Sequence, residues 1–407
     1  MTPTAPINNV NEKTKLRPGL NLVMAVAAGV AVANIYYNQP MLGIMEKDLP
    51  ASLTRFVPTA TQLGYAAGLF LLVPLGDLIE RRRLIVIQFG GLAVALAIAA
   101  IAPSAAMVVL ASLLVGVLST VAQQIVPLAA HLATPERRGA TVGTVMAGLL
   151  CGILLSRTLA GFVATYGGWR EMFWLGVPMA IGAGALMQWM LPHSAPDTTH
   201  SYGSLLRSLG GLWSEFAALR KAALTQALLF AGFSAFWTIL ALHLQEPSFS
   251  LGAAAAGLFG IVGAVGVLAA PVAGRIADRR GPQRVILFSA VLTLVAWGVF
   301  GAVGSIAGLI VGVVLLDFGV QSALVSNQHI VYALRRDARA RLNTIFMGAM
   351  FLGGAAGSAG VTVAWQAGGW SAVVLLGAIL SAAAVLIQLV AIRRVNQVQQ
   401  HVGLPGD

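Results

Sequence analysis

The sequence predicts an all-α membrane protein with twelve transmembrane helices in two pseudo-symmetric six-helix bundles. Three observations predict this fold class: an apolar composition, many apolar stretches of spanning length, and basic residues confined to alternate connections. Of the 407 residues, 58% are hydrophobic, only 10% are charged and 46 are glycine. A soluble chain of this length carries more charge than this, so we expect the lipid bilayer to be its environment.

The apolar stretches have the length of membrane crossings, since a helix needs about 20 mostly apolar residues to span the hydrocarbon core. Short polar or basic clusters separate them. The expected spans are 20–43, 59–79, 84–102, 105–132, 140–163, 171–191, 222–244, 253–273, 285–303, 306–333, 342–365 and 371–392.

The formal net charge of +11 is a signal of topology and does not predict nucleic-acid binding. Most of the 25 Lys and Arg residues lie in alternate connections, and examples are Arg81–Arg83, Arg137–Arg138 and Arg335–Arg341. Basic loops stay in the cytoplasm, so both termini are expected to be cytoplasmic in a multi-pass protein of the plasma membrane. The lone cysteine, Cys151, has no partner for a disulfide or a cysteine metal site.

Four landmarks recur in the same order in the two halves of the chain, which indicates duplication of a six-helix unit. The sequence GDLIERRRLIV from Gly76 returns as GRIADRRGPQRV from Gly274, and the GGW at Gly167 returns at Gly368. The expected division is a first bundle at 1–191, a cytoplasmic linker at 192–221 and a second bundle at 222–407. Glycine pairs such as Gly148/Gly152 and Gly353/Gly357 have the spacing of tightly packed membrane helices.

Several of these segments resemble the major facilitator superfamily of transporters. Its loop motif between helices 2 and 3 is matched best by the second copy, where Gly274, Ile276, Asp278, Arg279 and Gly281 fill the pattern. The phrases NIYYNQP from Asn34, GILLSRT from Gly152 and SNQ from Ser326 resemble a bacterial subgroup close to drug:proton antiporters and sugar exporters. The resemblance covers essentially the whole chain and implies the major facilitator fold and alternating-access transport.

The chain also departs from the antiporter pattern. Where those proteins carry an arginine in helix 4, Ser112 stands four residues before Gly116, and the glycine-proline pair of their helix 5 is absent between Gly148 and Gly161. The residues that couple transport to protons therefore have to be inferred from this sequence itself.

Asp317 is the strongest candidate for proton coupling, because a charge deep in a span is costly and therefore suggests a function. It heads a polar face of its helix that continues through Gln321 and Gln328 at helical spacing. A buried carboxylic acid can carry a proton. The alternative is a structural aspartate that is hydrogen-bonded within the bundle.

Arg157 is the other charged residue well inside a span. Its guanidinium remains charged, so it could bind an anionic substrate or pair with Asp317 across the two halves. We expect the two to act as one unit, in which protonation of Asp317 releases Arg157 to the substrate. The alternative is that its long stem reaches the outer membrane interface.

The resemblance places helices 1, 4, 7 and 10 around a central cavity, and polar or aromatic residues occur on each of them. Packing and hydrogen bonding between helices is the alternative role for any one of these amides. The further candidates for this cavity are Asn34, Tyr37 and Asn38, whose spacing predicts one shared face of helix 1, together with Gln123, Phe236 and Trp237.

The two loop motifs predict a conformational latch, because an acidic side chain can sit against the positive N-terminal end of a neighbouring helix and pair with nearby arginines. The alternative is that they only solvate a loop. The latch residues are Gly76, Glu80, Arg81, Gly274, Asp278, Arg279 and Gly281.

These features predict a secondary active transporter, specifically a proton-coupled exporter of drug-like compounds or metabolites. The alternatives are an uncoupled facilitator or a sugar or metabolite permease and, more remotely, a non-transporting receptor. No nucleophile with its base is found, so we do not expect an enzyme. No cofactor or metal is expected, protons are the expected coupling ion, and the partners are a small-molecule substrate and the bilayer, with the protein a monomer.

Overall fold

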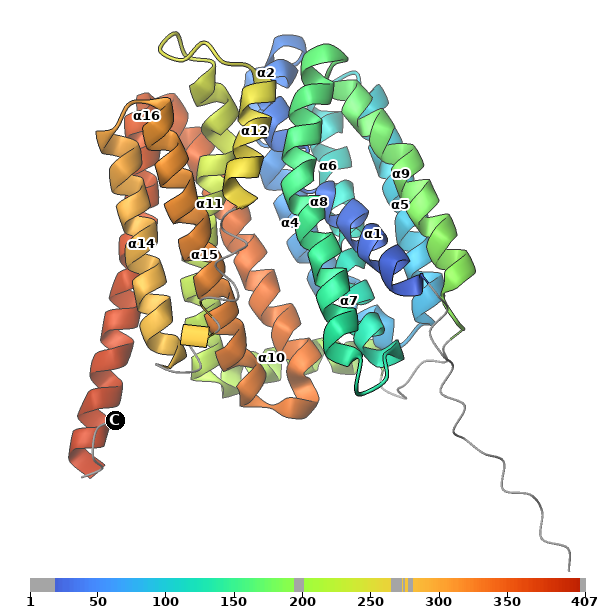
Figure 1. Ribbon diagram of the computed structural model, residues 1–407, viewed down its shortest axis with the longest axis vertical. Helices are drawn as coiled ribbons and strands as arrows, with labels where there is room; N and C mark the ends of the chain where they lie inside the picture. Colours follow the sequence, from blue (N-terminus) through green and yellow to red (C-terminus); the bar gives the residue numbers. More distant parts are fainter. Residues whose placement is uncertain (1–18, 194–200, 265–272, 274, 277–280, 403–407) are drawn as a thin grey trace, which may run out of the picture.

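The computed structural model describes residues 19–193, 201–264, 273, 275–276 and 281–402, and the described elements are helices. They run up and down between two ends of an elongated bundle (Figure 1). In this part of the chain, ten helices are long and apolar enough to cross a membrane. The predicted fold class is confirmed: with the two arms of the last helix counted separately and the shorter helix at Ala253–Gly263 added, the chain makes the twelve crossings of the prediction.

The first half of the chain is built from helices that alternate in direction. They are α1 (Leu20–Ala33), α2 (Asn38–Asp48), α3 (Ala51–Thr54), α4 (Val57–Leu71), the 3₁₀ helix η1 (Val73–Asp77), α5 (Arg81–Ile101), α6 (Ala105–Ser119), α7 (Val121–Leu132), α8 (Arg138–Tyr166) and α9 (Trp169–Met190).

The second half repeats this arrangement. Its helices are α11 (Ala217–Leu244), α12 (Ala253–Gly263), α14 (Pro282–Ala302), α15 (Ile306–Leu334), the 3₁₀ helix η3 (Arg336–Ala338) and α16 (Arg339–Val402), and α10 (Tyr202–Glu215) connects the two halves. Within the first half α1 packs on α8 and α5 on α9, and within the second α11 packs on α16 and α14 on α15. The boundaries 1–191, 192–221 and 222–407 remain a prediction.

Corresponding positions of the two halves have the same local structure. Ser104 caps the N-terminus of α6 by accepting from the Met107 N–H, and Ser305 caps α15 by accepting from the Gly308 N–H. In the two GGW turns the second glycine has positive φ, 115° at Gly168 and 56° at Gly369, which a residue with a side chain rarely adopts. The turn at Gly368–Gly369 divides α16 into two antiparallel arms.

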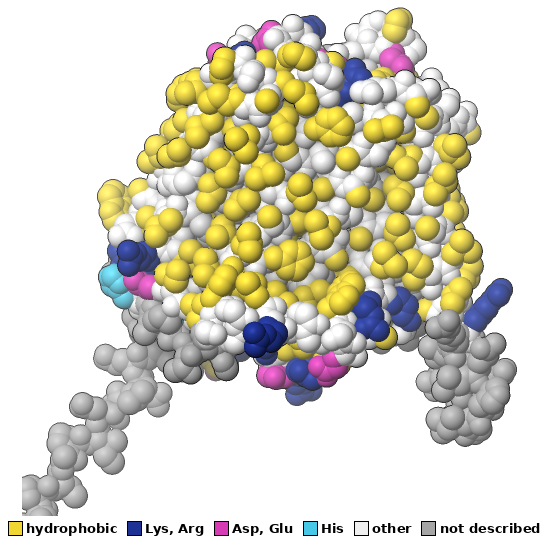
Figure 2. Space-filling view, turned by 180° about the vertical axis from the view of Figure 1, so that it is seen from behind, with side chains coloured by type: hydrophobic (Ala, Val, Ile, Leu, Met, Phe, Trp, Pro, Cys, Tyr) yellow, Lys and Arg dark blue, Asp and Glu magenta, His cyan; other side chains and the backbone are white. Residues whose placement is uncertain are grey.

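Charged side chains gather at the two ends of the molecule, and the surface between them is apolar (Figure 2). One end, called the basic end below, holds the starts of α5, α8 and α16 with Arg81, Arg138 and Arg339, together with α10. The opposite end holds the ends of α2, α8 and α11. The described basic loops therefore share one end of the bundle, as a membrane topology requires.

Small residues let the helices approach closely. A Cβ added to Gly148 or Gly152 of α8 would collide with the backbone of α1, and one added to Gly353 or Gly357 of α16 would collide with α11. These glycines therefore pack helices together, as their spacing predicts.

The two halves meet closely at the opposite end through α8 and α12. A Cβ on Gly257 would lie 2.7 Å from the Arg157 carbonyl oxygen, and one on Gly161 would meet the Ala253 carbonyl. The Thr158 hydroxyl donates to the Gly257 carbonyl at 3.0 Å, and the Ala254 N–H donates to the Thr165 hydroxyl at 3.1 Å. This crossing joins the two halves toward the opposite end and holds the Arg157 backbone against the second half.

Candidate functional site

Helix α1 ends in the middle of its span, and this break supplies part of the site. Between Ala33 and Asn38 the chain makes tight turns in which the Tyr36 N–H donates to the Ala33 carbonyl and the Gln39 N–H to the Tyr36 carbonyl. Pro40 lacks the N–H that a regular helix would give to the Tyr36 carbonyl, so the continuous helix expected over 20–43 is not formed. The break brings Tyr36 and Gln39 to the interface with the second half.

Arg157 is buried, with 2% of its surface exposed, and is held on three sides. Its Nε–H donates to Oε1 of Gln39 at 2.9 Å. The guanidinium lies over the ring of Tyr36 at 4.5 Å and over the ring of Trp237 at 4.1 Å, both measured from Cζ to the ring centroid. Its Nη2 has no hydrogen-bond partner among the described residues. The alternative, in which the Arg157 side chain extends to the outer membrane interface, does not apply to this conformation, because the side chain is buried.

Asp317 lies on the other side of Trp237, in the second half of the chain. It is 5% exposed, and its Oδ1 accepts a hydrogen bond from the indole N–H of Trp237 at 3.4 Å. Its Oδ2 faces Gly263 of α12 so closely that a Cβ there would collide with it. In the described part of the chain no direct ion pair joins Asp317 to Arg157, and the Trp237 indole contacts both, with its ring face at the guanidinium and its N–H at the carboxylate.

The structure separates the other candidate residues into different environments. Gln123 is half-buried and donates to the Tyr65 hydroxyl at 3.1 Å, and Gln328 contacts the Met347 sulfur at 3.8 Å. Gln321, on the same helix as Asp317, is also half-buried.

The three residues expected to share one face of helix 1 do not do so, because the helix breaks between them. Asn34 donates to the Val30 carbonyl of its own helix at 2.6 Å, and its oxygen faces Gly176 of α9. Asn38 donates to the Thr61 hydroxyl of α4 at 2.9 Å, and the buried Tyr37 hydroxyl has no hydrogen-bond partner in the part of the chain that the structure describes. Asn34 and Asn38 have structural bonds in this conformation, and a role for them in the cavity stays a prediction.

Phe236 belongs to an aromatic cluster inside the second half. It stacks on Phe300 at 4.5 Å between centroids and contacts Trp297 and Trp370. Trp237, the next residue, points instead to the interface, because successive residues of a helix face different directions.

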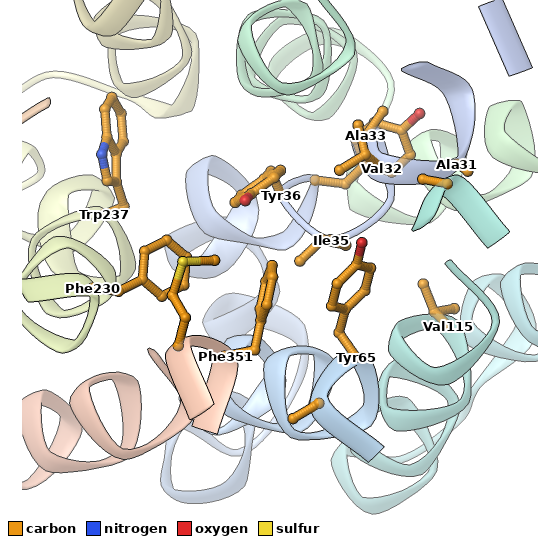
Figure 3. Packing of buried hydrophobic residues seen from close by; sticks show 14 of the residues in the cluster. Ala31, Val32, Ala33, Ile35, Tyr36, Tyr65, Val115, Phe230, Trp237 and Phe351 are labelled. Atoms are coloured by element: carbon orange, nitrogen blue, oxygen red, sulfur yellow. The ribbon is translucent and has the colours of Figure 1, made fainter. Parts of the chain in front are cut away.

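A row of aromatic rings extends from Trp237 along α11 and across to α4. Phe233 lies 6.1 Å from Trp237, Phe230 5.3 Å from Phe233, Phe351 5.3 Å from Phe230, and Tyr65 4.2 Å from Phe351. Figure 3 shows Phe230, Phe351 and Tyr65 side by side with Tyr36 and Trp237 near them, from helices of both halves. We call these five rings, Trp237, Phe233, Phe230, Phe351 and Tyr65, the aromatic row.

A cavity of about 80 Å³ lies at the basic end, where the aromatic row stops. Gln123, which binds the last ring, Tyr65, is part of its wall. Other lining residues are Gly76, Asp77, Arg81, Leu209 of α10 and Arg341. The row thus connects a basic-end cavity to the Arg157–Trp237–Asp317 cluster.

The described part of the latch is at the basic end. Glu80 directly precedes α5 and pairs with His193 at 2.7 Å, and Arg81 pairs with Asp77 at 3.5 Å and donates to the Gly76 carbonyl. Gly281 precedes α14 with φ of 80°. Gly274, Asp278 and Arg279 lie outside the described residues, and the latch role of both motifs stays a prediction.

Two residues that contact Arg157, Gln39 and Tyr36, were not among the predicted cavity residues, although the sequence gives a reason to consider each. Gln39 is an amide next to Pro40, and Tyr36 has the alternative role of a ring at the membrane interface. A third, Gln62, accepts from Ser234 of α11 at 2.9 Å across the two halves, and the only signal for it is that an amide is unusual inside a span.

Comparisons with known proteins agree on one kind of protein. The sequence model of the Major Facilitator Superfamily matches residues 24–269 and 222–402. The chain is 44% identical over 377 residues to the uncharacterized transporter YgaY of Escherichia coli O157:H7, covering 92% of this chain and 95% of YgaY. It is 32% identical over 363 residues to SCO4007 of Streptomyces coelicolor, a protein named as a transporter, covering 86% and 82% of the two chains.

Solved structures of transporters share the fold at low sequence identity. The nucleoside transporter NupG superposes with a TM-score of 0.73 at 14% identity, covering 91% of this chain and 99% of NupG. A D-xylose-proton symporter superposes with a TM-score of 0.70 at 15% identity, covering 91% and 97%.

Proposed function

Because the chain belongs to the major facilitator superfamily of membrane transporters, we propose that it is a proton-coupled exporter of small molecules that works by alternating access. The single observation that carries the proposal is Asp317, a carboxylic acid buried in the second half with the Trp237 indole as its one hydrogen-bond donor among the described residues. Such a group in the middle of a membrane protein is typical of proton carriers.

The position of Asp317 supports coupling of its proton to substrate binding. Among the described residues, Arg157 and Tyr36 are titratable groups near enough to interact with it electrostatically, and Gly263 of α12 lies against its Oδ2 atom. The occupancy of the site next to Arg157 and the proton on Asp317 therefore influence each other through charge.

Export from the cytoplasm is the direction that the resemblance to drug and sugar exporters favours. In this conformation the α8/α12 crossing closes the opposite end, and the aromatic row ends at a cavity of the basic end, which we assign to the cytoplasm. A substrate would enter there, bind near Arg157, and leave after the opposite end opens. Glu80 with its partner His193, and Asp278 in the second motif, are proposed to latch the loops of one conformation.

The experiment replaces the two charged residues and measures transport in proteoliposomes. Candidate compounds are screened for exchange in wild type, with and without an imposed pH gradient. Asp317→Asn is expected to abolish gradient-driven accumulation while retaining exchange in the absence of a gradient, because the proton carrier is gone but the binding arginine remains. Arg157→Ala is expected to lose both. Glu171→Gln, which neutralises an exposed carboxylate at the opposite end, is the control.

Full gradient-driven accumulation by Asp317→Asn would remove this residue from coupling. A wild-type protein that equilibrates its substrate but never accumulates it would favour the uncoupled facilitator. That alternative has its own support in Ser112 and the missing glycine-proline pair, where this chain departs from drug:proton antiporters.

A further inference from the structure

The two opposite charges at the centre of the protein are held one indole ring apart, and each has unused bonding capacity. In a dry interior a guanidinium and a carboxylate would ordinarily pair directly, because an isolated buried charge is costly. Here no direct pair forms, and Trp237 instead places its ring face under Arg157 and donates its N–H to Asp317. A ligand that carries a charge at each end could satisfy both groups at once.

The N–H groups of Arg157 that have no described hydrogen bond are those on its terminal nitrogens, and such groups can bind a carboxylate. The rings of Tyr36 and Trp237 lie against the guanidinium and Gln39 occupies Nε, so the terminal nitrogens are the ones left without a hydrogen bond from the described residues. Nη2 is buried without a partner. An arginine edge with parallel N–H groups binds a planar carboxylate through two hydrogen bonds.

The free bonding positions of Asp317 are acceptors. An ionised carboxylate has about four lone-pair sites, and the Trp237 indole occupies one of them. The other oxygen, Oδ2, lies close against Gly263 of α12, where an added Cβ would collide with it, and the described residues donate no hydrogen bond to it. A substituted ammonium group is the complementary donor for such a site.

The surroundings of the Arg157 guanidinium and the Asp317 carboxylate, called the two charged poles below, are apolar. Phe233 lies 5.7 Å from the Arg157 guanidinium, and Phe230 and Phe351 follow it along the aromatic row. All three rings are buried. A ligand body that extends from the charged poles along this row would have to be apolar or aromatic.

We propose that the substrate is a zwitterion of the amino-acid type with an apolar or aromatic side chain. Its carboxylate binds the edge of Arg157, its ammonium binds Asp317, and its side chain lies along the aromatic row. This inference rests on the proposed function, since it takes the cluster to be the site of a transported substrate.

The same arrangement gives a balanced exchange with the proton. When the ammonium group arrives, the Asp317 carboxylic acid releases its proton to water and the resulting carboxylate pairs with the ammonium. When the substrate leaves, the carboxylate takes up a proton again. Substrate and proton therefore compete for one group, as exchange in opposite directions requires.

The test compares one zwitterion with two analogues that each lack one charge. L-Phenylalanine, N-acetyl-L-phenylalanine and L-phenylalaninamide are titrated against the purified full-length protein, with the melting temperature as the readout of binding. Wild type should bind phenylalanine roughly 10-fold or more tightly than either analogue, the size expected when one partner of a desolvated charge pair is missing.

Variants assign each pole. Arg157→Ala should bind phenylalanine and its amide equally, since the carboxylate has lost its partner, while Asp317→Asn should bind phenylalanine and its N-acetyl derivative equally. Arg157→Lys, which keeps the charge but not the planar edge, separates a lost contact from a misfolded protein. Phe233→Ala should weaken the binding of phenylalanine more than the binding of glycine, because glycine has no side chain to contact the aromatic row.

The outcomes distinguish this inference from the proposed function. Equal or tighter binding of the amide in wild type would indicate a cation site, equal or tighter binding of the N-acetyl compound would indicate an anion site, and either result would overturn the inference. If another compound then drives proton movement that requires Asp317, proton-coupled transport stands without the zwitterion. If phenylalanine binds with the expected pattern but its transport moves no proton, the zwitterion inference is supported and the proposed proton coupling is wrong.

Discussion

At the scale of single residues, the hydrogen bond between Gln39 and Arg157 is the clearest contact that the geometry adds to the sequence. Gln39 is buried, and its Oε1 accepts the Arg157 Nε–H at 2.9 Å. Replacing Gln39 by Leu should lower the free energy of unfolding by roughly 1–3 kcal/mol, because a donor on a buried charge loses its acceptor. Titration of the purified protein with SDS in mixed micelles measures this change.

The matched control for that change removes the donor as well. In an Arg157→Met background, where no guanidinium remains to be satisfied, Gln39→Leu should cost much less, and the difference between the two backgrounds gives the coupling energy of the pair. Equal costs in both backgrounds would show that Gln39 stabilises the protein through some other contact.

Residue identity alone predicts Asp317 and Arg157 as a functional pair, because charges deep in apolar spans are rare. It does not predict the indole between them, since the direction of Trp237 depends on how α11 is rotated against α8 and α15. The same limit applies to Phe236. Its neighbour in sequence reaches the interface, whereas Phe236 packs on Phe300 within the second half.

At the scale of elements, the number and order of the helices follow from hydropathy and from the repeat, but the shape of helix 1 does not. A window of apolar residues averages over the turns between Ala33 and Asn38, and the candidate face of Asn34, Tyr37 and Asn38 assumes a regular helix. Pro40 indicates that the helix is interrupted near this position, but the conformation of the turns depends on packing against α8 and α11.

The crossing of α8 and α12 carries a prediction about conformational equilibrium. A methyl group at Gly161 would meet the Ala253 carbonyl, so Gly161→Ala should widen the crossing and increase the population that is open at the opposite end. Gly143→Ala is the matched control, because Gly143 lies on the same helix with nothing within 4 Å of an added Cβ.

Spin labels at two exposed sites report this equilibrium. Cysteines at Tyr166 and Gly252, introduced after the exposed Cys151 is replaced by Ser, place labels beside the ends of α8 and α12. Gly161→Ala should add a longer distance to the distribution measured by electron paramagnetic resonance, and Gly143→Ala should not. An unchanged distribution in both variants would mean that the crossing tolerates the methyl group without opening.

At the scale of the whole molecule, the described basic loops lie at one end, and the apolar surface lies between the two charged ends (Figure 2). This arrangement fixes which loops share a side, but the choice of side depends on the positive-inside rule. It predicts that Gly139, in the first turn of α8, and Ser214 on α10 face the cytoplasm, whereas Gly304, between α14 and α15, faces outward.

Labelling of single cysteines decides this orientation. In a Cys151→Ser background, cysteines replace Gly139, Ser214 or Gly304, which are all exposed. No atom lies within 4 Å of a Cβ added at Gly139 or Gly304, so neither substitution should disturb packing. A maleimide that cannot cross the membrane should label the Gly304 site in intact cells, and the other two only after the cells are opened. The reverse pattern would place the basic end outside. The substrate would then reach the aromatic row from outside the cell, and the direction of transport would have to be import.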